Sequence, residues 1–193
     1  MTNEHSLDPL RQFVRDMTQL VDAGAGSLEL VDKGETMMAK LVADDSWLPA
    51  EFAKPHPQYY QQYLLHCDPL ERFSVVSFVW GPGQKTPIHD HTVWGLIGVL
   101  SGGELETRFD LVNGVLQAGE VTRLEPGHIG RLSEDDGDVH QVANAFEDRV
   151  SISIHVYGGN IGKVRRHVFD PQTGASKDFI SSYSSNVMPN IWA

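Results

Sequence analysis

Apolar residues in the N-terminal part of the chain recur every three or four positions, which is the period of an amphipathic helix. One such stripe runs from Leu10 to Val21, and a second runs from about Leu28 to Val42. Several prolines then interrupt the pattern, and a further short helix is predicted over Gln58 to His66. The sequence therefore predicts a helical segment over about residues 1–55.

From Arg72 onward the pattern changes to short runs rich in Val, Ile, Phe and Thr, separated by glycine-containing turns. Such runs are typical of strands in a β-sandwich or a small barrel. The predicted strands are Phe73–Trp80, Val93–Leu100, Glu104–Asp110, Val121–Leu124, Val139–Ala143, Val150–Tyr157 and Lys163–Phe169. We therefore expect a mainly β fold with its barrel core over about residues 56–170. Residues 171–193 form a Ser-rich tail, and Trp192 is expected to pack it back onto the body, so that residues 1–193 form one domain.

Composition and charge narrow the classes of function. The 193 residues are 40% hydrophobic and 21% charged, which is ordinary for a soluble globular protein. No apolar run reaches the roughly 18 residues that a membrane span needs, and the first residues lack the layout of a signal peptide. A cytoplasmic monomer without a membrane partner is therefore expected. The net charge of −11 argues against a nucleic-acid partner, because binding to phosphates relies on clustered Lys and Arg.

The sole cysteine, Cys67, excludes an internal disulfide and a metal site built from several thiolates. A single cysteine is more often a small buried apolar residue than a nucleophile. Any metal chemistry in this chain must therefore use nitrogen and oxygen ligands.

The most informative motif is His89-Asp90-His91. In an extended strand, residues two apart point to the same face, so the two imidazoles could bind one metal ion without a bend in the backbone. The same face would continue through apolar or small residues, which predicts that it looks inward: Val93, Gly95, Ile97 and Val99. Burial of two imidazoles there is unfavourable unless each finds a partner, and a metal ion is one such partner.

A third histidine would come from later in the chain. His140 is favoured because Asn144 follows it in a His-x3-Asn pattern, and His128, directly after Pro-Gly, is the alternative. Three neutral histidines leave coordination positions open, which indicates catalysis more than a structural role. Imidazole ligands suit iron, zinc, copper or nickel, so the ligand type alone does not choose the metal.

A second motif, Ser153-x-His155-x-Tyr157, also has period two, so its three polar residues share one strand face and Ile152, Ile154 and Val156 share the other. Two interpretations are open. Either the aliphatic face is core and the polar face meets water, or the polar face lines a site in which Ser153 orients His155 and His155 orients the Tyr157 hydroxyl. The nearby histidine cluster favours the second.

Together these motifs resemble the cupin superfamily, whose fold is a jelly-roll-like small β-barrel, and within it the thiol dioxygenases of the cysteine dioxygenase type. The resemblance covers roughly Gln58 to Phe169. In the first cupin motif a Glu ligand ordinarily follows the His-x-His pair, and here Gly95 stands in its place. An all-histidine triad is a hallmark of thiol dioxygenases. The resemblance therefore implies Fe(II) held by His89, His91 and His140, in an enzyme that adds both atoms of dioxygen to a thiol and forms a sulfinate.

Departures from the family bear on the substrate. In animal-type enzymes a cysteine near the iron is cross-linked to the active-site tyrosine, and Gly95 at the corresponding position forbids that link. The animal-type arginine for the substrate carboxylate is also missing, and Gln62 resembles the glutamine of a bacterial branch similar to 3-mercaptopropionate dioxygenases. In that branch an arginine after the Ser-His-Tyr strand is thought to bind the carboxylate. Arg166 is the best positional match, with Arg165 and Arg72 as alternatives.

The resemblance thus implies a dioxygenase for L-cysteine, 3-mercaptopropionate or mercaptosuccinate, and Gln62 and Gly95 favour 3-mercaptopropionate. Tyr157 would donate a hydrogen bond in the site, and Gln62 and Arg166 would bind the carboxylate. Two other classes remain open. One is another metal-dependent cupin enzyme, such as a ring-cleaving dioxygenase or an isomerase. The other is a non-catalytic cupin that binds a small ligand.

Overall fold

Two helices precede the strands in the computed structural model, which describes residues 6–133 and 138–193. They are α1 (Asp8–Asp22) and α2 (Ser27–Leu41), and a 3-10 turn, η1 (Ala50–Phe52), follows them. The predicted N-terminal helical segment is therefore confirmed. Within the described ranges, no helix has both the length and the apolar character needed to cross a membrane.

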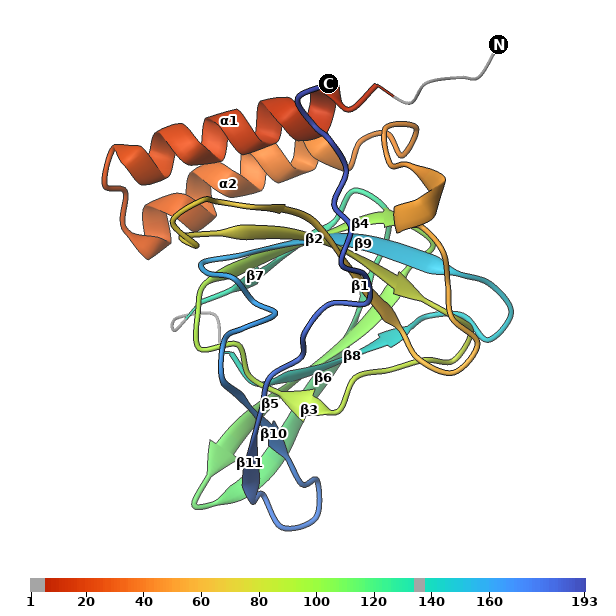
Figure 1. Ribbon diagram of the computed structural model, residues 1–193. Coiled ribbons are helices and arrows are strands. Elements are labelled where there is room, and N and C mark those ends of the chain that lie inside the picture. The colour runs from red at the N-terminus through yellow and green to blue at the C-terminus, as the bar shows by residue number, and fades with distance from the viewer. Residues whose placement is uncertain (1–5, 134–137) are drawn as a thin grey trace.

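Antiparallel strands form two sheets below the helices (Figure 1). The first sheet has the order β1-β2-β9-β4-β7, with bounds Gln61–Cys67, Ser74–Trp80, Ser151–Tyr157, Gly95–Ser101 and Ile129–Leu132. The second has the order β11-β10-β3-β8-β5-β6, with bounds Ser176–Phe179, Arg166–Phe169, Ile88–His89, His140–Asn144, Glu104–Val112 and Val115–Leu124. This confirms the mainly β, cupin-type architecture.

The five-stranded sheet is buried on both faces. Its outer face packs against the helices in one core cluster, which joins Met17 and Met38 of the helices to Ile154 and Val156 of β9. Its inner face packs in a second cluster with side chains such as Trp80. The aliphatic face of the Ser-His-Tyr strand is therefore covered by helices, and its polar face looks into the barrel.

The predicted helix over Gln58–His66 is wrong, because this segment contains β1, which pairs antiparallel with β2. Tyr60 and Leu64 pack on the inner cluster, whereas Tyr63 and Leu65 belong to the outer one. This alternation has period two. By pattern alone, a short aromatic and aliphatic run fits either a helix or a strand. Here the segment forms a strand because it pairs with the edge of β2 that β9 does not occupy.

The β5–β6 hairpin is longer than predicted because β6 lies mostly at the surface and has no apolar pattern. Asn113 and Gly114 join the two strands with φ values of 51° and 79°. Positive φ at both central residues suits the tight turn that Asn-Gly favours, so this dipeptide was the available signal. The short strands β7 and β11 were also missed, and β11 is largely exposed and polar.

The C-terminal tail returns to the helices, as expected, and Trp192 contacts α1, where the Arg15 guanidinium lies 5.5 Å from the centre of its ring. Ile191 is buried in the helical core cluster, while Trp192 is 57% exposed. Arg11 on α1 fastens the tail, because its Nε donates to the Ile191 carbonyl at 2.5 Å.

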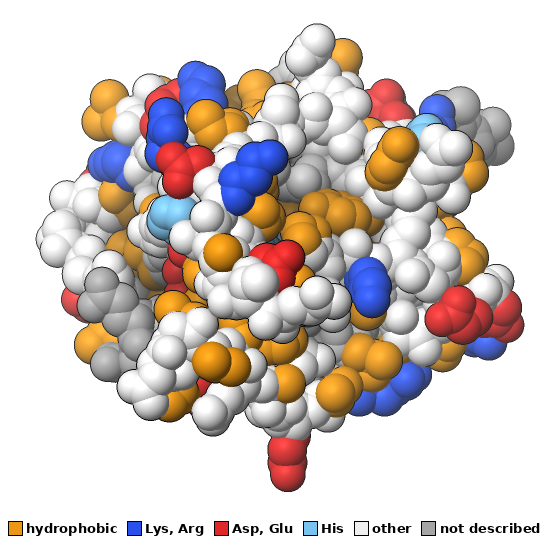
Figure 2. Space-filling model, turned by 90° about the horizontal axis from the view of Figure 1, so that it is seen from below, with side chains coloured by type: hydrophobic (Ala, Val, Ile, Leu, Met, Phe, Trp, Pro, Cys, Tyr) orange, Lys and Arg blue, Asp and Glu red, His pale blue; other side chains and the backbone are white. Residues whose placement is uncertain are grey.

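The face away from the helices carries charges of both signs (Figure 2). Hydrophobic side chains are scattered there among polar ones, and Lys and Arg lie interspersed with Asp and Glu. The negative charge of the chain is therefore not concentrated on this face.

Candidate metal centre

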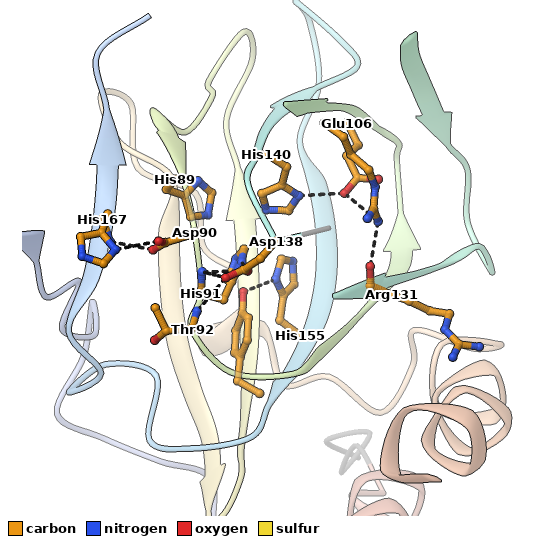
Figure 3. A network of polar contacts seen from close by, with 12 residues as sticks. His89, Asp90, His91, Thr92, Glu106, Arg131, Asp138, His140, His155 and His167 are labelled. Carbon is orange, nitrogen blue, oxygen red and sulfur yellow. Dashed lines mark hydrogen bonds and ion pairs between the residues drawn. The ribbon is translucent and has the colours of Figure 1, made fainter. Parts of the chain in front are cut away.

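Three histidines converge inside the barrel (Figure 3). His89 at the end of β3 lies directly opposite His140 at the start of β8, and His91 follows two residues later. Their candidate ligand atoms all lie within 4.8 Å of one another, and all three side chains are buried. The structure therefore brings together the three residues named from the sequence.

The two histidines of the motif do not share one continuous strand, which differs from the prediction. β3 ends at His89, and Thr92 has a φ of 58°, so the chain turns before β4 begins at Gly95. His91 reaches the cluster from this turn. Asp90, between the two histidines, faces away and accepts hydrogen bonds at 2.7 Å from the backbone nitrogen and the Nδ1 of His167, which fastens β10 to β3.

Each histidine of the cluster has one ring nitrogen occupied by the protein. Nδ1 of His89 lies 3.0 Å from the Pro87 carbonyl, Nδ1 of His91 lies 2.8 Å from Asp138, and Nδ1 of His140 lies 2.7 Å from Glu106. Such acceptors fix the tautomer that protonates Nδ1 and leaves the Nε2 lone pair free.

A metal ion fits the atoms that remain. Nε2 of His91 is buried and makes no hydrogen bond. A buried polar nitrogen without a partner is unfavourable, and coordination to a metal would satisfy it. Burial lowers the pKa of His91 to about 4 and that of His89 well below its usual value, so both rings are neutral near pH 7 and can act as ligands.

The acceptors behind the ligands are ionised. Burial raises the pKa of Glu106 and of Asp138, but hydrogen bonds with His140 and His91, together with the charges and further donors around each acid, outweigh it and lower both values. Two carboxylates thus stand behind two of the three imidazoles. Sequence analysis missed both, although Asp138 lies two positions before His140 and Glu106 alternates with apolar residues on a predicted strand.

Glu106→Gln is expected to weaken metal binding by roughly 10–100-fold, because the substitution removes the charge that holds His140. Competition with a chelator of known affinity measures this. Asp110→Asn on the same strand is the matched control, because Asp110 is exposed and far along the strand from the cluster. Equal metal affinity for the Glu106→Gln variant and the unmodified protein would contradict the role given to Glu106.

The Ser-His-Tyr residues form a hydrogen-bonded chain beside the cluster. Ser153 Oγ lies 2.7 Å from His155 Nε2, and His155 Nδ1 lies 2.8 Å from the Tyr157 hydroxyl. The Phe78 ring stacks on His155 with centroids 3.9 Å apart, and the Tyr157 ring stacks on His91 at 5.5 Å. The Tyr157 side chain therefore links this chain to the three histidines.

Gly95 lies directly opposite Tyr157 in the β4–β9 pair. A Cβ atom at this position would stand 3.1 Å from Cδ1 of the Tyr157 ring. Leu132 and the Val156 carbonyl oxygen would stand equally close, at 3.1 and 3.2 Å, so the backbone of residue 95 packs tightly against the tyrosine and offers no side chain for a cross-link.

The candidate carboxylate-binding residues differ in their surroundings. Arg166 is 4% exposed, its Nη2 donates to Ser181 at 2.7 Å, and its buried Nε has no hydrogen-bond partner. Its charge acts on the hydroxyls of Tyr157 and Tyr60. Gln62 lies opposite Phe78 in the β1–β2 pair, so it shares the strand face that looks into the barrel.

The alternatives left open by the sequence lie elsewhere. The exposed Arg165 pairs with Asp178 at 2.9 Å. Arg72 pairs with Asp22 and Asp68 near the helices. His128 is exposed and accepts a hydrogen bond from the backbone of its own turn.

Comparison with known proteins agrees with this geometry. The chain matches the family described as cysteine dioxygenase type I over residues 1–170. It is 31% identical to cysteine dioxygenase type 1 of Danio rerio over 173 residues, which cover 86% of this chain and 82% of the relative. The rat enzyme of the same name is 27% identical over 119 residues, 59% of this chain and 58% of that protein.

Among solved structures, a Klebsiella pneumoniae protein with a double-stranded β-helix domain aligns with a TM-score of 0.47 at 23% identity. That alignment covers 57% of this chain and 82% of the other. The family match extends over the helices, strands β1 to β10 and every residue of the histidine cluster. The chain therefore belongs to the cysteine dioxygenase type I family.

Proposed function

We propose that the protein is a thiol dioxygenase that uses Fe(II) and dioxygen to convert a small thiol carboxylic acid into its sulfinic acid. In this reaction both oxygen atoms end on the thiol sulfur, which is oxidised while dioxygen is reduced, so no other reductant is needed. The observation that supports it most is the cluster of three buried imidazoles, with an unpartnered Nε2 on His91, in a chain of this family.

His89, His91 and His140 would hold the iron through their Nε2 atoms. Bound Fe(II) would supply open coordination positions for the two reactants, together with the redox chemistry that joins them. The protein contributes fixed ring orientations through Pro87, Asp138 and Glu106.

Tyr157 would donate a hydrogen bond to the reacting groups. Its ring lies against His91, and His155 holds its hydroxyl at 2.8 Å. Burial raises the pKa of Tyr157 far above its usual value, so the phenol keeps its proton at neutral pH. A neutral donor held in place can stabilise charge that develops on oxygen or sulfur.

Arg166 would bind the substrate carboxylate, with Gln62 assisting from β1. The guanidinium is buried, and its Nε keeps an unused donor. A planar guanidinium can meet a carboxylate with two hydrogen bonds. Burial lowers the pKa of Arg166, since a charge is costly there, and a bound carboxylate would offset that cost.

Arg166→Ala is expected to lower kcat/KM for 3-mercaptopropionate by roughly 10²-fold, because hydrogen bonds to a charged group contribute about 1.5–3 kcal/mol each. The loss should appear mainly in KM. Arg165→Ala is the matched control and should leave both constants unchanged, because this neighbour points outward to Asp178. A small thiol without a carboxylate should be oxidised equally by the Arg166→Ala variant and the unmodified enzyme. If the variant impairs both kinds of thiol alike, Arg166 does not recognise the carboxylate.

The preference for 3-mercaptopropionate rests on Gly95 and Gln62, which depart from the animal-type pattern. Iron-loaded protein is incubated aerobically with 3-mercaptopropionate, L-cysteine and mercaptosuccinate, and oxygen uptake and sulfinate are measured. The expected order of kcat/KM places 3-mercaptopropionate first. A higher value for L-cysteine would overturn the preference, and no thiol-dependent uptake by fully iron-loaded protein would overturn the function.

A further inference from the structure

Glu104 is a fully buried acid beside the Ser153–His155–Tyr157 chain. It lies on β5 with 0% exposure, on the same inward strand face as Glu106. Neither carboxyl oxygen makes a hydrogen bond of standard geometry, and its polar neighbours are the Ser153 hydroxyl and the Trp80 indole. A buried carboxyl group without a firm partner is costly, so its presence at this point requires an explanation.

Ser153 is the member of the hydrogen-bonded chain that acts on the Glu104 carboxyl group. Trp80 Nε1 donates to Ser153 Oγ at 3.2 Å, and the same oxygen lies 2.7 Å from His155 Nε2. A hydroxyl has one proton to donate and two lone pairs to accept with. Because Trp80 uses one lone pair, the two other contacts are coupled. If the Ser153 hydroxyl donates its proton to Glu104, then His155 Nε2 must donate to the Ser153 oxygen. If Glu104 donates to Ser153 instead, the Ser153 hydroxyl donates to His155 Nε2.

His155 carries this coupling to Tyr157. Burial lowers the pKa of His155 well below its usual value, so the ring is neutral and carries one proton. With the proton on Nε2, the bare Nδ1 accepts the Tyr157 proton across 2.8 Å. With the proton on Nδ1, His155 donates to the Tyr157 oxygen, and the phenolic proton is free for the histidine cluster.

We propose that Glu104 sets the tautomer of His155 and thereby the direction in which Tyr157 donates its proton. Protonated Glu104 donates to Ser153, Ser153 donates to His155 Nε2, and the Tyr157 proton is released towards the metal centre. Ionised Glu104 takes the Ser153 proton, reverses each bond, and holds the Tyr157 proton at His155 Nδ1. Glu104 is then a positioning residue. Its effect on rate rests on the proposed function, whereas its effect on the tautomer does not.

The surroundings of Glu104 place this change near neutral pH. Burial raises its pKa to about 7; the polar neighbours oppose this shift and the charge of Glu106 adds to it. Its partners on the adjacent strands, Asn144 on β8 and Leu124 on β6, are uncharged. Tyr157 on β9 keeps its proton over this range because burial raises its pKa. The releasing form therefore dominates below the midpoint and the closed form above it.

The tautomer can be observed directly by nitrogen NMR of the ¹⁵N-histidine-labelled 193-residue chain loaded with diamagnetic zinc, over a pH range centred on the pKa of Glu104. His155 is expected to change from the Nδ1-protonated to the Nε2-protonated form as pH rises, with the same midpoint as the ¹³C signal of the Glu104 carboxyl group. In Glu104→Gln it should hold one tautomer at every pH. The unmodified iron enzyme should lose about tenfold in kcat per pH unit above the midpoint, and the variant should lack this decline.

Ser153→Ala provides the control, because it should leave Glu104 titrating while His155 no longer responds. A single His155 tautomer in the unmodified protein while Glu104 titrates would overturn the inference. The inference also fails if the tautomer of His155 still changes in Glu104→Gln with the same midpoint as in the unmodified protein. If Glu104→Gln fails to fold, the comparison of the His155 tautomer in the unmodified protein and in Ser153→Ala still tests the inference. Thiol oxidation with a fixed tautomer rejects this inference alone, and a working switch without thiol oxidation rejects the proposed function alone.

Discussion

His140→Ala is expected to remove metal binding and to reduce thiol oxidation by on the order of 10³-fold or more. His140 supplies one of the three converging nitrogens, and no other described histidine lies within reach of the cluster. A metal centre contributes several kcal/mol to a reaction barrier, and each 1.36 kcal/mol corresponds to tenfold in rate. The substitution also leaves the buried Glu106 without its partner at 2.7 Å, which adds a cost to stability. Metal content by elemental analysis and oxygen uptake measure the two effects.

The matched control is His128→Ala. This histidine was the other candidate for the third ligand, but it is exposed and accepts a hydrogen bond from Glu125 in its own turn. Its replacement should leave metal content and turnover unchanged. Retention of both metal and turnover in His140→Ala, or their loss in His128→Ala, would contradict the assignment of the third ligand.

Tyr157→Phe is expected to lower kcat by roughly 10²–10³-fold with metal content unchanged, because loss of one fixed hydrogen-bond donor at a reacting centre has an effect of this size. The ring can keep its stacking on His91, so binding of the metal should not suffer. Steady-state kinetics and metal analysis on the same preparation separate an effect on kcat from an effect on metal binding. Full turnover in the variant would remove Tyr157 from the mechanism.

Tyr183→Phe controls for the loss of a tyrosine hydroxyl as such. The Tyr183 hydroxyl donates to Asn160 at 2.6 Å and accepts from the Gly162 nitrogen, away from the histidines. Stability can fall in this variant while kcat stays constant. A similar fall in kcat for both tyrosines would show that the effect in Tyr157→Phe comes from packing.

The sequence predicted the fold class because the helical period of the first two stripes and the strand period after Arg72 are both clear, although the segment between them contains strand β1 and not the predicted helix. It named His89 and His91 because buried imidazoles two residues apart need partners. The pattern of the Ser-His-Tyr strand alone did not decide between its two interpretations, and only the nearby histidines favoured the one in which the polar face lines a site. That choice depends on α1 and α2, which cover the opposite face of β9. Both faces of this strand are buried, and the local sequence pattern does not show which face packs against the helices and which lines the barrel.

The acids behind the metal ligands were out of reach for the same reason. Glu106 meets His140 only because β5 pairs with β8 in the register that sets Arg108 opposite His140. Asp138 accepts from the backbone of His91 and Thr92 across a turn that the sequence did not predict. Glu104 on β5 and Ser153 on β9 belong to different sheets, and Ser153 still acts on the Glu104 carboxyl group. Such contacts depend on the register between strands that are far apart in the chain, and this register cannot be deduced from a single sequence.

We propose that three histidines hold an iron centre at which dioxygen and a thiol react. Turnover of 3-mercaptopropionate under ¹⁸O₂, with mass analysis of the sulfinic acid, tests it most directly. Both sulfinate oxygens are expected to carry the label, and product and label are expected to be lost together in His140→Ala. A product with one labelled oxygen or none, or a labelled product that survives the loss of His140, would contradict it.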